Sequence, residues 1–546
     1  MDIDKLKTTR RREQQLEHLS PFELKDNLIK LASDQQKEPV KTMLNAGRGN
    51  PNWTATIPRE AFFTLGQFAI EECKLPMSTT SGLSGIPQKE GIAERFQDFI
   101  RKNRHFPGID LLEGLYNYGI EKHGFNPEEW VFELAEGVIG DQYPSPVRML
   151  KHTEVIVHDY IIQEMCGNNP IRSGKFDLFA TEGGTAAMCY IFDSLIENRL
   201  LHKGDKIAIG VPAFTPYLEI PQLERYQFKV TYIRGSAKDE EGDSTFQYPE
   251  SELDKLGDKS IKAFFIINPS NPTSVEICDK CRKYLVKVVK NLNPNLMILT
   301  DDVYGTFVEG FNSIMNELPQ NTLCVYSFSK YFGATGWRLG VIALYEDNIY
   351  DDMLSAIPEK DKLRLDKLYE SLTIYPRKLK FIDRLVADSR QVALNHTAGL
   401  SLPQQMQMLL FAAFALLDKE NNYKKDCNQL VHHRFDLLWE GLNIPVKPDP
   451  ERAAYYSEID IEEWALKNYG KEFVAFLEKN FEPVDIVFRL AEKSSIVLLN
   501  GGGFAGPEWS VRVSLANLNE EDYSVIGKEL SETMQEYVDA WKSTLK

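Results

Sequence analysis

The sequence predicts an α/β protein built on a mostly parallel β-sheet. Short apolar segments alternate with helical patterns through the middle of the chain, and these segments read as continuously apolar, which is typical of buried parallel strands. Glycines and polar residues directly follow several of these strands. In an open parallel sheet, ligands bind beyond the carboxyl ends of the strands, so these residues are the candidates for a functional site.

The expected strands are apolar and end at a turn, a glycine or a polar residue. Helical patterns separate several of them, such as EGGTAAMCYIFDSLIENRLL (182–201) after the first, and a further helix begins near Cys278. Strands joined through helices are typical of parallel sheets, which need crossover connections. In chain order the strands are FDLFAT (176–181), KIAIGV (206–211), FKVTYI (228–233), IKAFFII (261–267), NLMILT (295–300), TLCVYSF (322–328) and GVIALY (340–345).

The chain divides into three expected parts. Residues 1–58 form an N-terminal arm with part of a small domain, residues 59–425 form the large domain, and residues 426–546 complete the small α/β domain. Two helical insertions, 88–135 and 348–392, interrupt the large domain and could serve assembly. A single long helical pattern begins near residue 404, and the strand-like segments SSIVLLNGGGF and WSVRVSLANL follow it.

Charge and composition exclude several classes of function. The 546 residues include 63 basic and 80 acidic side chains, a formal charge of -17, which argues against nucleic acid or an anionic membrane as partner. The sequence contains no apolar run of membrane-spanning length, and its N-terminus lacks the apolar core of a secretory signal. Seven scattered cysteines, an odd number, indicate free thiols and hence a cytoplasmic protein.

One cysteine pair has the spacing of a metal or redox motif. Cys278 and Cys281 form a CxxC sequence, but no second pair follows at the spacing of a zinc site. We therefore expect two ordinary helix cysteines and no metal.

A phosphate-binding site is expected where TEGGT joins a strand to a helix. Gly183 and Gly184 allow close approach of the backbone, Thr185 adds a hydroxyl, and the amide groups at a helix N-terminus attract anions. Glycine-rich turns are often purely structural. The segment YSFSKYFGATGWRLG (326–340) strengthens the functional interpretation. It contributes Ser327, Lys330 and Arg338, which could serve the same phosphate-bearing ligand.

These residues together suggest pyridoxal 5'-phosphate. Lys330 would stand beside a phosphate-bearing ligand, and a buried lysine is a good nucleophile toward carbonyl groups. The cofactor also needs a carboxylate near its pyridine nitrogen, and Asp301 follows an apolar strand. Tyr304 and Asn271 are candidates for its 3'-oxygen. Asp301 could instead belong to a solvated loop and NPSNPTS to a plain turn, but all of these features occur at successive strand ends.

The motifs GGT, NPSNPTS, DDVY and SFSKYFGATGWRLG, in this order, resemble the aspartate aminotransferase superfamily, the pyridoxal-phosphate enzymes of fold type I. The resemblance implies that Lys330 carries the cofactor as a Schiff base and transfers protons. It places Asp301 on the pyridine nitrogen, and Asn271 with Tyr304 on the 3'-oxygen. The residues that it assigns to the phosphate are Gly184, Thr185, Ser327 and Arg338.

The same resemblance implies three further roles. Phe214, in VPAFTPY, would stack on the cofactor ring. Arg512, in WSVRVSLA, would pair with the substrate α-carboxylate, and such pairs are commonly bidentate. Tyr143, in GDQYPSP, would reach the phosphate in a neighbouring subunit, which makes a homodimer the smallest active unit.

The extra length and the segments NAGRGNPNW and GVIGDQYPSPVRML resemble one subfamily, the aspartate 4-decarboxylases. The resemblance implies that aspartate becomes alanine and CO2, that Arg48 contacts a substrate carboxylate, and that dimers join into a large assembly, a dodecamer. Arg390 is a weaker candidate for the same pocket. Water can compete with loss of CO2, so weak aminotransferase activity is expected as well.

Three alternatives remain open. An aspartate aminotransferase, or one for another dicarboxylic amino acid, would share the same site. A pyridoxal-phosphate-binding transcriptional regulator would need a DNA-binding module, and KTTRRREQQLEHL is the only short basic patch. A structural protein with a retired site would not need the complete residue set.

Overall fold

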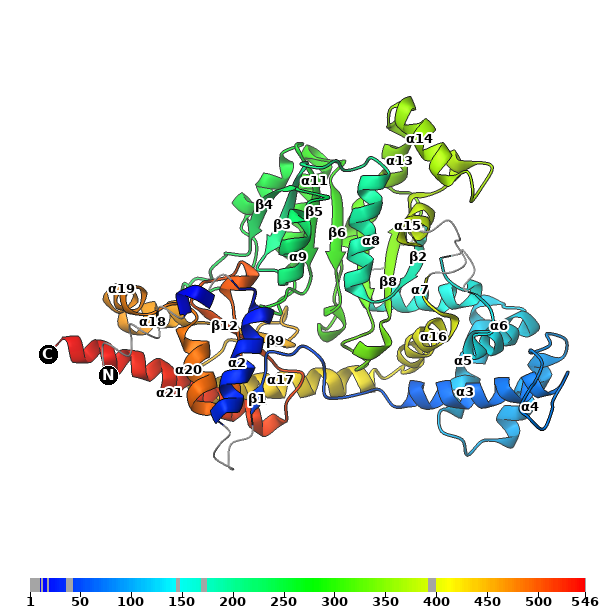
Figure 1. Ribbon diagram of the computed structural model, residues 1–546, viewed down its shortest axis with the longest axis horizontal. Coiled ribbons are helices and arrows are strands. Elements are labelled where there is room, and N and C mark those ends of the chain that lie inside the picture. The colour runs from blue at the N-terminus through cyan, green and yellow to red at the C-terminus, as the bar shows by residue number, and fades with distance from the viewer. Residues whose placement is uncertain are drawn as a thin grey trace.

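The computed structural model describes residues 10, 13–16, 19–35, 43–143, 148–167, 174–390 and 399–545. Figure 1 shows a central sheet with helices on both sides, a helical group at one end and a smaller sheet with helices at the other. The helical group is α3 (Ile57–Lys74), α4 (Ile92–Lys102), α5 (Ile109–His123) and α6 (Pro127–Ile139). The helices at the opposite end are α18 (Ile461–Tyr469), α19 (Lys471–Asn480), α20 (Asp485–Ser494) and α21 (Glu520–Thr544).

The central sheet confirms the predicted α/β class with a mostly parallel sheet. Its seven strands lie in the order β2-β8-β7-β6-β5-β3-β4, and only β8 runs antiparallel to its neighbours. Residues 328–339 join β7 to β8 and include no α-helix, and β8 turns back beside β7. The strands are β2 (Phe176–Thr181), β3 (Lys206–Val211), β4 (Lys229–Arg234), β5 (Ile261–Ile267), β6 (Met297–Asp301), β7 (Thr322–Ser327) and β8 (Gly340–Tyr345).

Helices bury both faces of this sheet. On one face, strand residues such as Leu178 and Cys324 pack with α7 (Lys151–Met165). On the other face, alternate residues such as Phe179 and Val325 pack with α8 (Gly184–Glu197) and α15 (Phe381–Arg390). Burial on both faces explains why the strands are continuously apolar.

The two predicted insertions are helical. Segment 88–135 contributes α4, α5 and α6, which share an apolar core with α3 and α16 (Leu402–Leu417). Segment 348–392 contributes α13 (Ile349–Ala356), α14 (Glu359–Tyr369) and α15. The prediction of one long helix from residue 404 was wrong: α16 ends at Leu417, and α17 (Asn422–Leu442) begins after Asn421, whose backbone is left-handed.

Strands from both ends of the chain meet in the smaller sheets. β9 (Tyr456–Asp460) and β11 (Leu499–Asn500) flank β12 (Ser510–Ser514), all antiparallel, while β1 (Leu44–Asn45) pairs with β10 (Ile496–Val497). The remaining helical elements connect strands or flank the sheets: α2 (Pro21–Gln35), α9 (Thr215–Glu219), η1 (Ile220–Gln222), α10 (Glu250–Leu253), η2 (Asp254–Gly257), α11 (Asp279–Leu292), η3 (Gly305–Phe307), α12 (Ile314–Glu317), η4 (Pro319–Asn321), η5 (Thr335–Trp337), η6 (Pro376–Lys378) and η7 (Gly502–Phe504).

No helix in the described part of the chain is both long enough and apolar enough to cross a lipid bilayer.

Candidate active site

A cavity of about 330 Å³ lies at the carboxyl ends of β5, β6 and β7. The N-terminus of α8 and residues of the small sheet close it from other sides. Sequence motifs that are far apart in the chain therefore meet at one place. The predicted residues that line the cavity are Gly184, Thr185, Phe214, Asn271, Asp301, Tyr304, Ser327, Lys330, Arg338 and Arg512.

One end of the cavity has the chemistry of a phosphate site. Thr185 lies in the first turn of α8, and Ser327 and Arg338 face the same space. Two carbonyl groups hold the Arg338 guanidinium, because its Nη1 donates to Thr335 O at 3.0 Å and its Nη2 donates to Glu182 O at 3.2 Å. Gly183 lies directly behind: a Cβ atom there would come within 2.4 Å of Arg338 Nη2.

A buried carboxylate occupies another side. Asp301 ends β6, and the Tyr217 hydroxyl donates to its Oδ2 at 2.7 Å. Burial raises the pKa of Asp301, while the hydrogen bonds from Tyr217 and from the Val303 amide oppose this rise. A cation placed beside Asp301 would hold the proton-free form, as charges of opposite sign do.

Lys330 reaches the cavity from the loop after β7. Its Nζ donates to Gly49 O at 2.8 Å and lies 6.0 Å from the centre of the Tyr455 ring. Gly49 leaves no room for a side chain, since a Cβ atom would come within 2.3 Å of the Tyr456 hydroxyl. The chain at residue 49 therefore fixes the lysine amine through its backbone.

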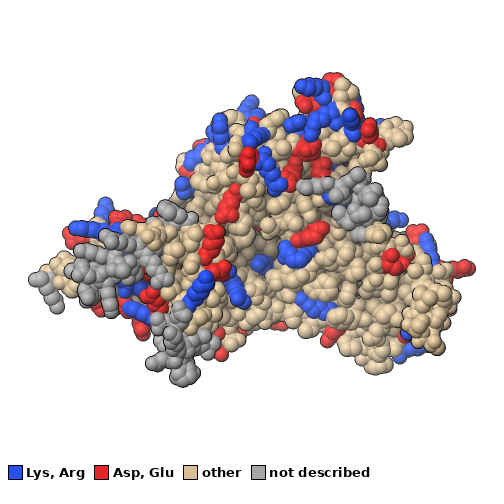
Figure 2. Space-filling view, in the orientation of Figure 1, with Lys and Arg blue, Asp and Glu red and all other residues tan. Residues whose placement is uncertain are grey.

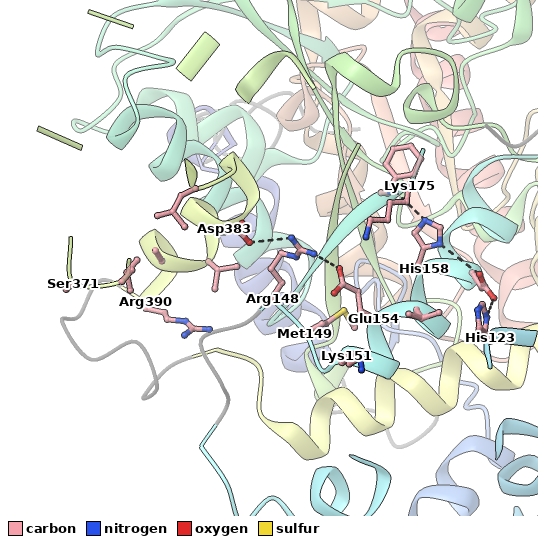
Figure 3. A pocket seen from close by; sticks show the side chains of 17 residues that line it. His123, Arg148, Met149, Lys151, Glu154, His158, Lys175, Ser371, Asp383 and Arg390 are labelled. Carbon is pink, nitrogen blue, oxygen red and sulfur yellow. Dashed lines mark hydrogen bonds and ion pairs between the residues drawn. The ribbon is translucent and has the colours of Figure 1, made fainter. Parts of the chain in front are cut away.

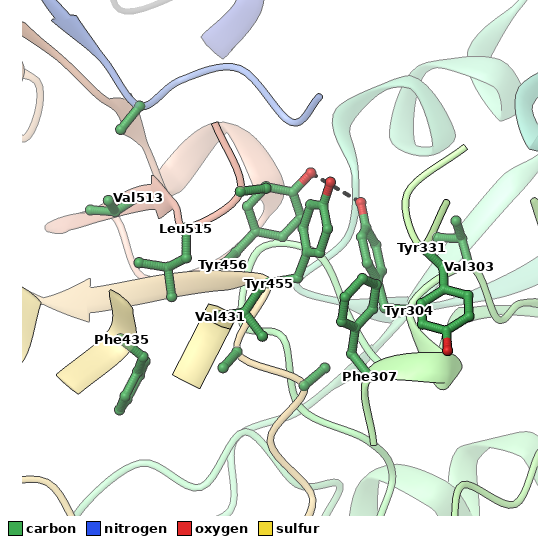
Figure 4. Close-up of a cluster of buried hydrophobic side chains, with 14 of the residues drawn as sticks. Val303, Tyr304, Phe307, Tyr331, Val431, Phe435, Tyr455, Tyr456, Val513 and Leu515 are labelled. Atoms are coloured by element: carbon green, nitrogen blue, oxygen red, sulfur yellow. Dashed lines mark hydrogen bonds between the residues drawn. The ribbon is translucent and has the colours of Figure 1, made fainter. Parts of the chain in front are cut away.

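Three tyrosines form a compact group beside this lysine (Figure 4). The hydroxyls of Tyr304 and Tyr456 are 3.0 Å apart, and the Tyr455 hydroxyl donates to Gly49 O at 2.9 Å. Burial raises the pKa values of Tyr304 and Tyr455 well above their usual range, so both hydroxyls stay protonated at neutral pH. The site therefore offers neutral hydrogen-bond donors next to the amine.

Arg512, on β12, is a cation in a nearly closed aromatic setting. It is 1% exposed, and its guanidinium carbon lies 4.4 Å from the centre of the Tyr456 ring. Its Nη1 donates to Asn271 Oδ1 at 3.0 Å and its Nη2 to Gly47 O at 2.9 Å. Its Nε has no hydrogen-bond partner among the described residues. A buried guanidinium with a donor to spare suits a carboxylate ligand.

Besides Gly183, three predicted residues lie outside this cavity's lining. Arg48 is exposed, although it precedes Gly49 directly. Tyr143 is 74% exposed, and its expected partner belongs to another subunit. Arg390 lines a different cavity of about 950 Å³, in which Arg148 pairs with Glu154 and Asp383 (Figure 3).

The sequence analysis missed several lining residues. Tyr217 stands three residues after Phe214 in VPAFTPY, and its bond to Asp301 depends on how the short helix α9 lies. Ser329 flanks Lys330 and donates its backbone N–H to Ser327 Oγ at 3.3 Å. Tyr456 belongs to no recognisable motif. The only signal in the sequence was the pair of adjacent tyrosines, Tyr455 and Tyr456.

Comparisons with known proteins identify the family of this chain. Residues 180–528 match the family model described as aminotransferase class I and II. A Pseudomonas protein, the bifunctional aspartate aminotransferase and L-aspartate beta-decarboxylase, is 48% identical over 97% of this chain and 98% of its own length. The chain belongs to the class I and II aminotransferase family. The Pyrococcus horikoshii aspartate aminotransferase is a more distant member, 27% identical over 43% of this chain and 57% of its own length.

Solved structures of class I and II aminotransferases share the fold. A Thermus thermophilus aspartate aminotransferase double mutant matches with a TM-score of 0.54 at 17% identity, over 93% of this chain and 95% of its own. The aromatic aminotransferase of Pyrococcus horikoshii matches with a TM-score of 0.54 at 17% identity, over 94% of this chain and 99% of its own. At 17% sequence identity, these two structures show a shared fold and nothing more.

The cofactor of this aminotransferase family is pyridoxal 5'-phosphate, and the cavity fits it. A helix N-terminus with Thr185, Ser327 and Arg338 suits a phosphate, and the buried Asp301 suits a protonated ring nitrogen. Lys330 supplies the amine. Arg512 lines the same cavity, and a guanidinium suits a carboxylate ligand.

Proposed function

We propose that this enzyme removes the side-chain carboxylate of L-aspartate as CO2 and releases L-alanine, with a weaker aspartate aminotransferase activity. The observation that carries the proposal is the relative of matching length, which bears both activities in its name and is 48% identical to this chain over 97% of it. The residues of the cavity agree, since an amine, a buried carboxylate and a buried guanidinium converge there.

The cofactor, when bound, withdraws electrons from the substrate carbon next to its nitrogen. We propose that Gly184, Thr185, Ser327 and Arg338 hold its phosphate, and that Asp301 faces its ring nitrogen. Asn271 and Tyr304 suit its 3'-oxygen, and Phe214 its ring. These residues all line one cavity: Gly184, Thr185, Phe214, Asn271, Asp301, Tyr304, Ser327 and Arg338.

Lys330 is the residue that we expect to move protons to and from the substrate. Its Nζ lies in the cavity, and the bond to Gly49 O at 2.8 Å fixes its position. The neighbouring Tyr304 hydroxyl is buried, and its raised pKa keeps it protonated, so it does not compete with the amine as a base. A positioned amine of this kind is an effective general base and acid.

Two arginines divide the work of binding aspartate. Arg512 binds the α-carboxylate, because its guanidinium lines the cavity and packs on the Tyr456 ring. Arg48 orients the side-chain carboxylate from an exposed loop that adjoins Gly49. A tight pair with the carboxylate that leaves would stabilise the ground state and slow the reaction. An exposed arginine selects aspartate without holding the carboxylate too firmly.

The active unit is a homodimer, and dimers join into a larger assembly, a dodecamer. Tyr143 is 74% exposed and does not line the cavity of its own chain, which is compatible with a role in a neighbouring copy. The end of the molecule formed by α3 and the following loop exposes several large apolar side chains, as assembly surfaces do. They include Phe63, Ile70, Leu75, Met77, Leu83 and Ile86.

We also place the enzyme in the cytoplasm. All seven cysteines are free thiols, four of them buried. Reducing compartments keep thiols in this state.

The deciding experiment supplies aspartate alone to the purified holoenzyme. Alanine, oxaloacetate and CO2 are followed together, without a keto-acid acceptor. We expect alanine and CO2 in equal amounts over many turnovers, and little oxaloacetate. A reaction that stops after one turnover without an acceptor would identify the protein as an aminotransferase for aspartate or another dicarboxylic amino acid.

A second assay tests the side activity. With aspartate and 2-oxoglutarate, slow formation of glutamate is expected beside the faster release of CO2. Complete absence of glutamate would contradict a shared site for both activities. Lys330→Ala should abolish both products, and Lys229→Ala, on the exposed start of β4, is the control that should leave both unchanged.

A further inference from the structure

Cys278 and Cys281 form a CxxC pair at the start of α11 and take no part in the active site. Cys278 is the N-cap residue, and its Sγ accepts a hydrogen bond from the Cys281 amide at 3.4 Å. The Cys281 thiol donates to Tyr248 O at 3.3 Å and is buried. Residues three apart on a helix lie close enough for their sulfur atoms to bond after a rotation of one side chain.

The two thiols differ in acidity in the way that a reactive pair requires. The neighbouring Cys281 side chain and the backbone amides at the start of α11 lower the pKa of Cys278 to about 6, against the effect of burial. The neighbouring Cys278 side chain, together with burial, raises the pKa of Cys281. Burial raises the pKa values of Cys166 and Cys427 to about 12. A thiolate at Cys278 is the form that reacts with oxidants.

Cys278 is also accessible. It is half-buried and lines a cavity of about 790 Å³ between the segments 239–247 and 443–452. Acidic side chains such as Asp239, Asp243 and Asp460 line the same cavity. They disfavour an anionic oxidant such as glutathione disulfide, so a small neutral peroxide is the better match.

We propose that Cys278 and Cys281 are a reversible redox site: hydrogen peroxide oxidises the Cys278 thiolate, and Cys281 completes a disulfide that weakens substrate binding. The Cys278 sulfur attacks one peroxide oxygen, the O–O bond breaks, and hydroxide leaves, which takes up a proton to form water. The Cys281 thiol then gives up its proton as its sulfur attacks Cys278, and the S–O bond breaks to release a second water. Two thiols are oxidised, and one peroxide is reduced to two waters.

The link to the active site is the segment between β5 and α11. Asn271 lies in it and accepts from Arg512 Nη1 at 3.0 Å. Backbone bonds join it to residues 451–453, with Glu276 N to Glu451 O and Ala453 N to Ser274 O both at 2.8 Å.

The disulfide would change both ends of this connection. It would remove the hydrogen bond from the Cys281 thiol to Tyr248 O and weaken the one from the Cys281 amide to Cys278 Sγ at the start of α11. The segment that places Asn271 against Arg512 would then be held less firmly. We therefore expect the KM for aspartate to rise by about threefold or more. A threefold rise corresponds to less binding free energy than one hydrogen bond to a charged group contributes. This consequence rests on the proposed function, whereas formation of the disulfide does not.

The test treats the holoenzyme with a small excess of hydrogen peroxide, blocks the free thiols by alkylation, and maps each cysteine by mass spectrometry. We expect Cys278 and Cys281 to escape alkylation together and to recover after dithiothreitol. Cys189 is the internal control, because it is half-buried as well but burial raises its pKa. Trypsin cuts after Lys280, so two peptides that stay joined identify the disulfide.

Variants separate the steps. In Cys281→Ser, a dimedone adduct should form at Cys278, because the sulfenic acid lacks its partner thiol. Cys278→Ser keeps an N-cap acceptor and should show no oxidation at residue 281. Equal oxidation of Cys189, or full alkylation of Cys278 after peroxide, would overturn the redox site.

Activity gives an independent arm of the test. The wild-type KM should rise with peroxide and return with dithiothreitol, and the KM of Cys278→Ser should stay constant. A disulfide without a change of KM would overturn the link to Asn271. If aspartate proves not to be the substrate, the alkylation result still decides whether the redox site exists.

Discussion

Arg512 is the residue that we propose to bind the substrate's α-carboxylate. Arg512→Lys keeps the charge but loses the planar pair of donors and the packing on Tyr456, 4.4 Å away. A hydrogen bond to a charged group contributes about 1.5–3 kcal/mol, so we expect kcat/KM for aspartate to fall by about 10- to 100-fold. Steady-state assays with aspartate check this.

Arg434→Lys is the matched control for that substitution. Arg434 is buried too, and it donates to Leu515 O at 3.0 Å and to Asn52 Oδ1 at 2.9 Å, but it does not line the active-site cavity. This change should lower stability without a specific loss of aspartate binding. An equal loss of kcat/KM in both variants would contradict the role of Arg512.

Arg48 is an exposed neighbour of the site. Its substitution should change kcat/KM less than that of Arg512, and should do so mainly through KM. Arg48→Ala removes a solvent-exposed charge, which we propose orients the side-chain carboxylate of the substrate. We expect KM for aspartate to rise by about two- to fivefold with little change of kcat, because exposed ion pairs contribute about 0.2–1 kcal/mol. Arg225→Ala, another exposed arginine, should leave KM unchanged. An unchanged KM in Arg48→Ala would remove this residue from the site.

Glu458 gives the protein a pH dependence that a neutral side chain would not. Burial raises the pKa of Glu458 to about 8, although a hydrogen bond from Ser510 and the charge of Arg512 oppose this rise. Between pH 4.5 and about 8 the folded protein therefore keeps a proton on Glu458 that the unfolded chain has released. This contribution to stability is complete below about pH 4.5 and is lost as pH rises toward 8, at up to about 1.4 kcal/mol per pH unit.

Glu458→Gln should therefore gain in Tm relative to the wild type between pH 5 and about pH 8. The measurement is a series of thermal unfolding curves for both proteins. Glu508→Gln, which replaces an exposed carboxylate, should show a constant difference from the wild type over the same range. Parallel curves for Glu458→Gln and the wild type would show that Glu458 does not titrate there.

At the scale of elements, the turn between β2 and α8 is the most constrained part of the cofactor site. Gly183 has a φ of 90°, and a Cβ atom there would lie 2.4 Å from Arg338 Nη2. Gly183→Ala should therefore displace Arg338 and weaken cofactor binding. A hydrogen bond to a charged group contributes about 1.5–3 kcal/mol, so we expect the Kd to rise by about 10- to 100-fold, as titration of the apoenzyme with pyridoxal 5'-phosphate would measure.

Gly204→Ala separates backbone strain from this contact. Gly204 has a φ of 85° but no atom within 4 Å of the added Cβ position, and it lies away from the cavity. It should lose stability and keep its affinity for the cofactor. Equal affinities in the two variants would mean that Arg338 does not depend on Gly183.

The elements also show which features the sequence could predict. Asp301 and Ser327 end strands whose apolar runs are unmistakable, so their place at one edge of the sheet followed from the pattern. The bond from Tyr217 to Asp301 did not follow, because it depends on the orientation of a five-residue helix. The antiparallel direction of β8 likewise depends on the connection before it, residues 328–339, rather than on its own residues.

At the scale of the whole molecule, distant segments assemble the site. Backbone bonds join the segment before α11 to residues 451–453, and the residues that follow place Tyr456 in the cavity wall. Pairing of this kind leaves no periodic signal in the sequence. The division at residues 58 and 425 stays a prediction, supported by the pairing of β1 with β10 near opposite ends of the chain.

The assembly surface is the feature of the whole molecule that a single substitution can test. Phe63 and Ile70, both on α3, are 64% and 49% exposed. Figure 2 shows fewer charged side chains over this end of the molecule than over α13 and α14. These exposed apolar side chains support the proposed contact between dimers.

Phe63→Glu places a charge in that contact and should reduce the assembly to dimers, as light scattering with size-exclusion chromatography would show. The activity of each dimer should change by no more than about twofold, since an exposed substitution alters local energies by about 0.5 kcal/mol or less. Leu466→Glu, 46% exposed on α18 at the opposite end, should leave the assembly intact. If Phe63→Glu and the wild type elute together as a larger assembly, that assembly uses another surface. If the wild type itself elutes as a dimer, the chain forms no larger assembly.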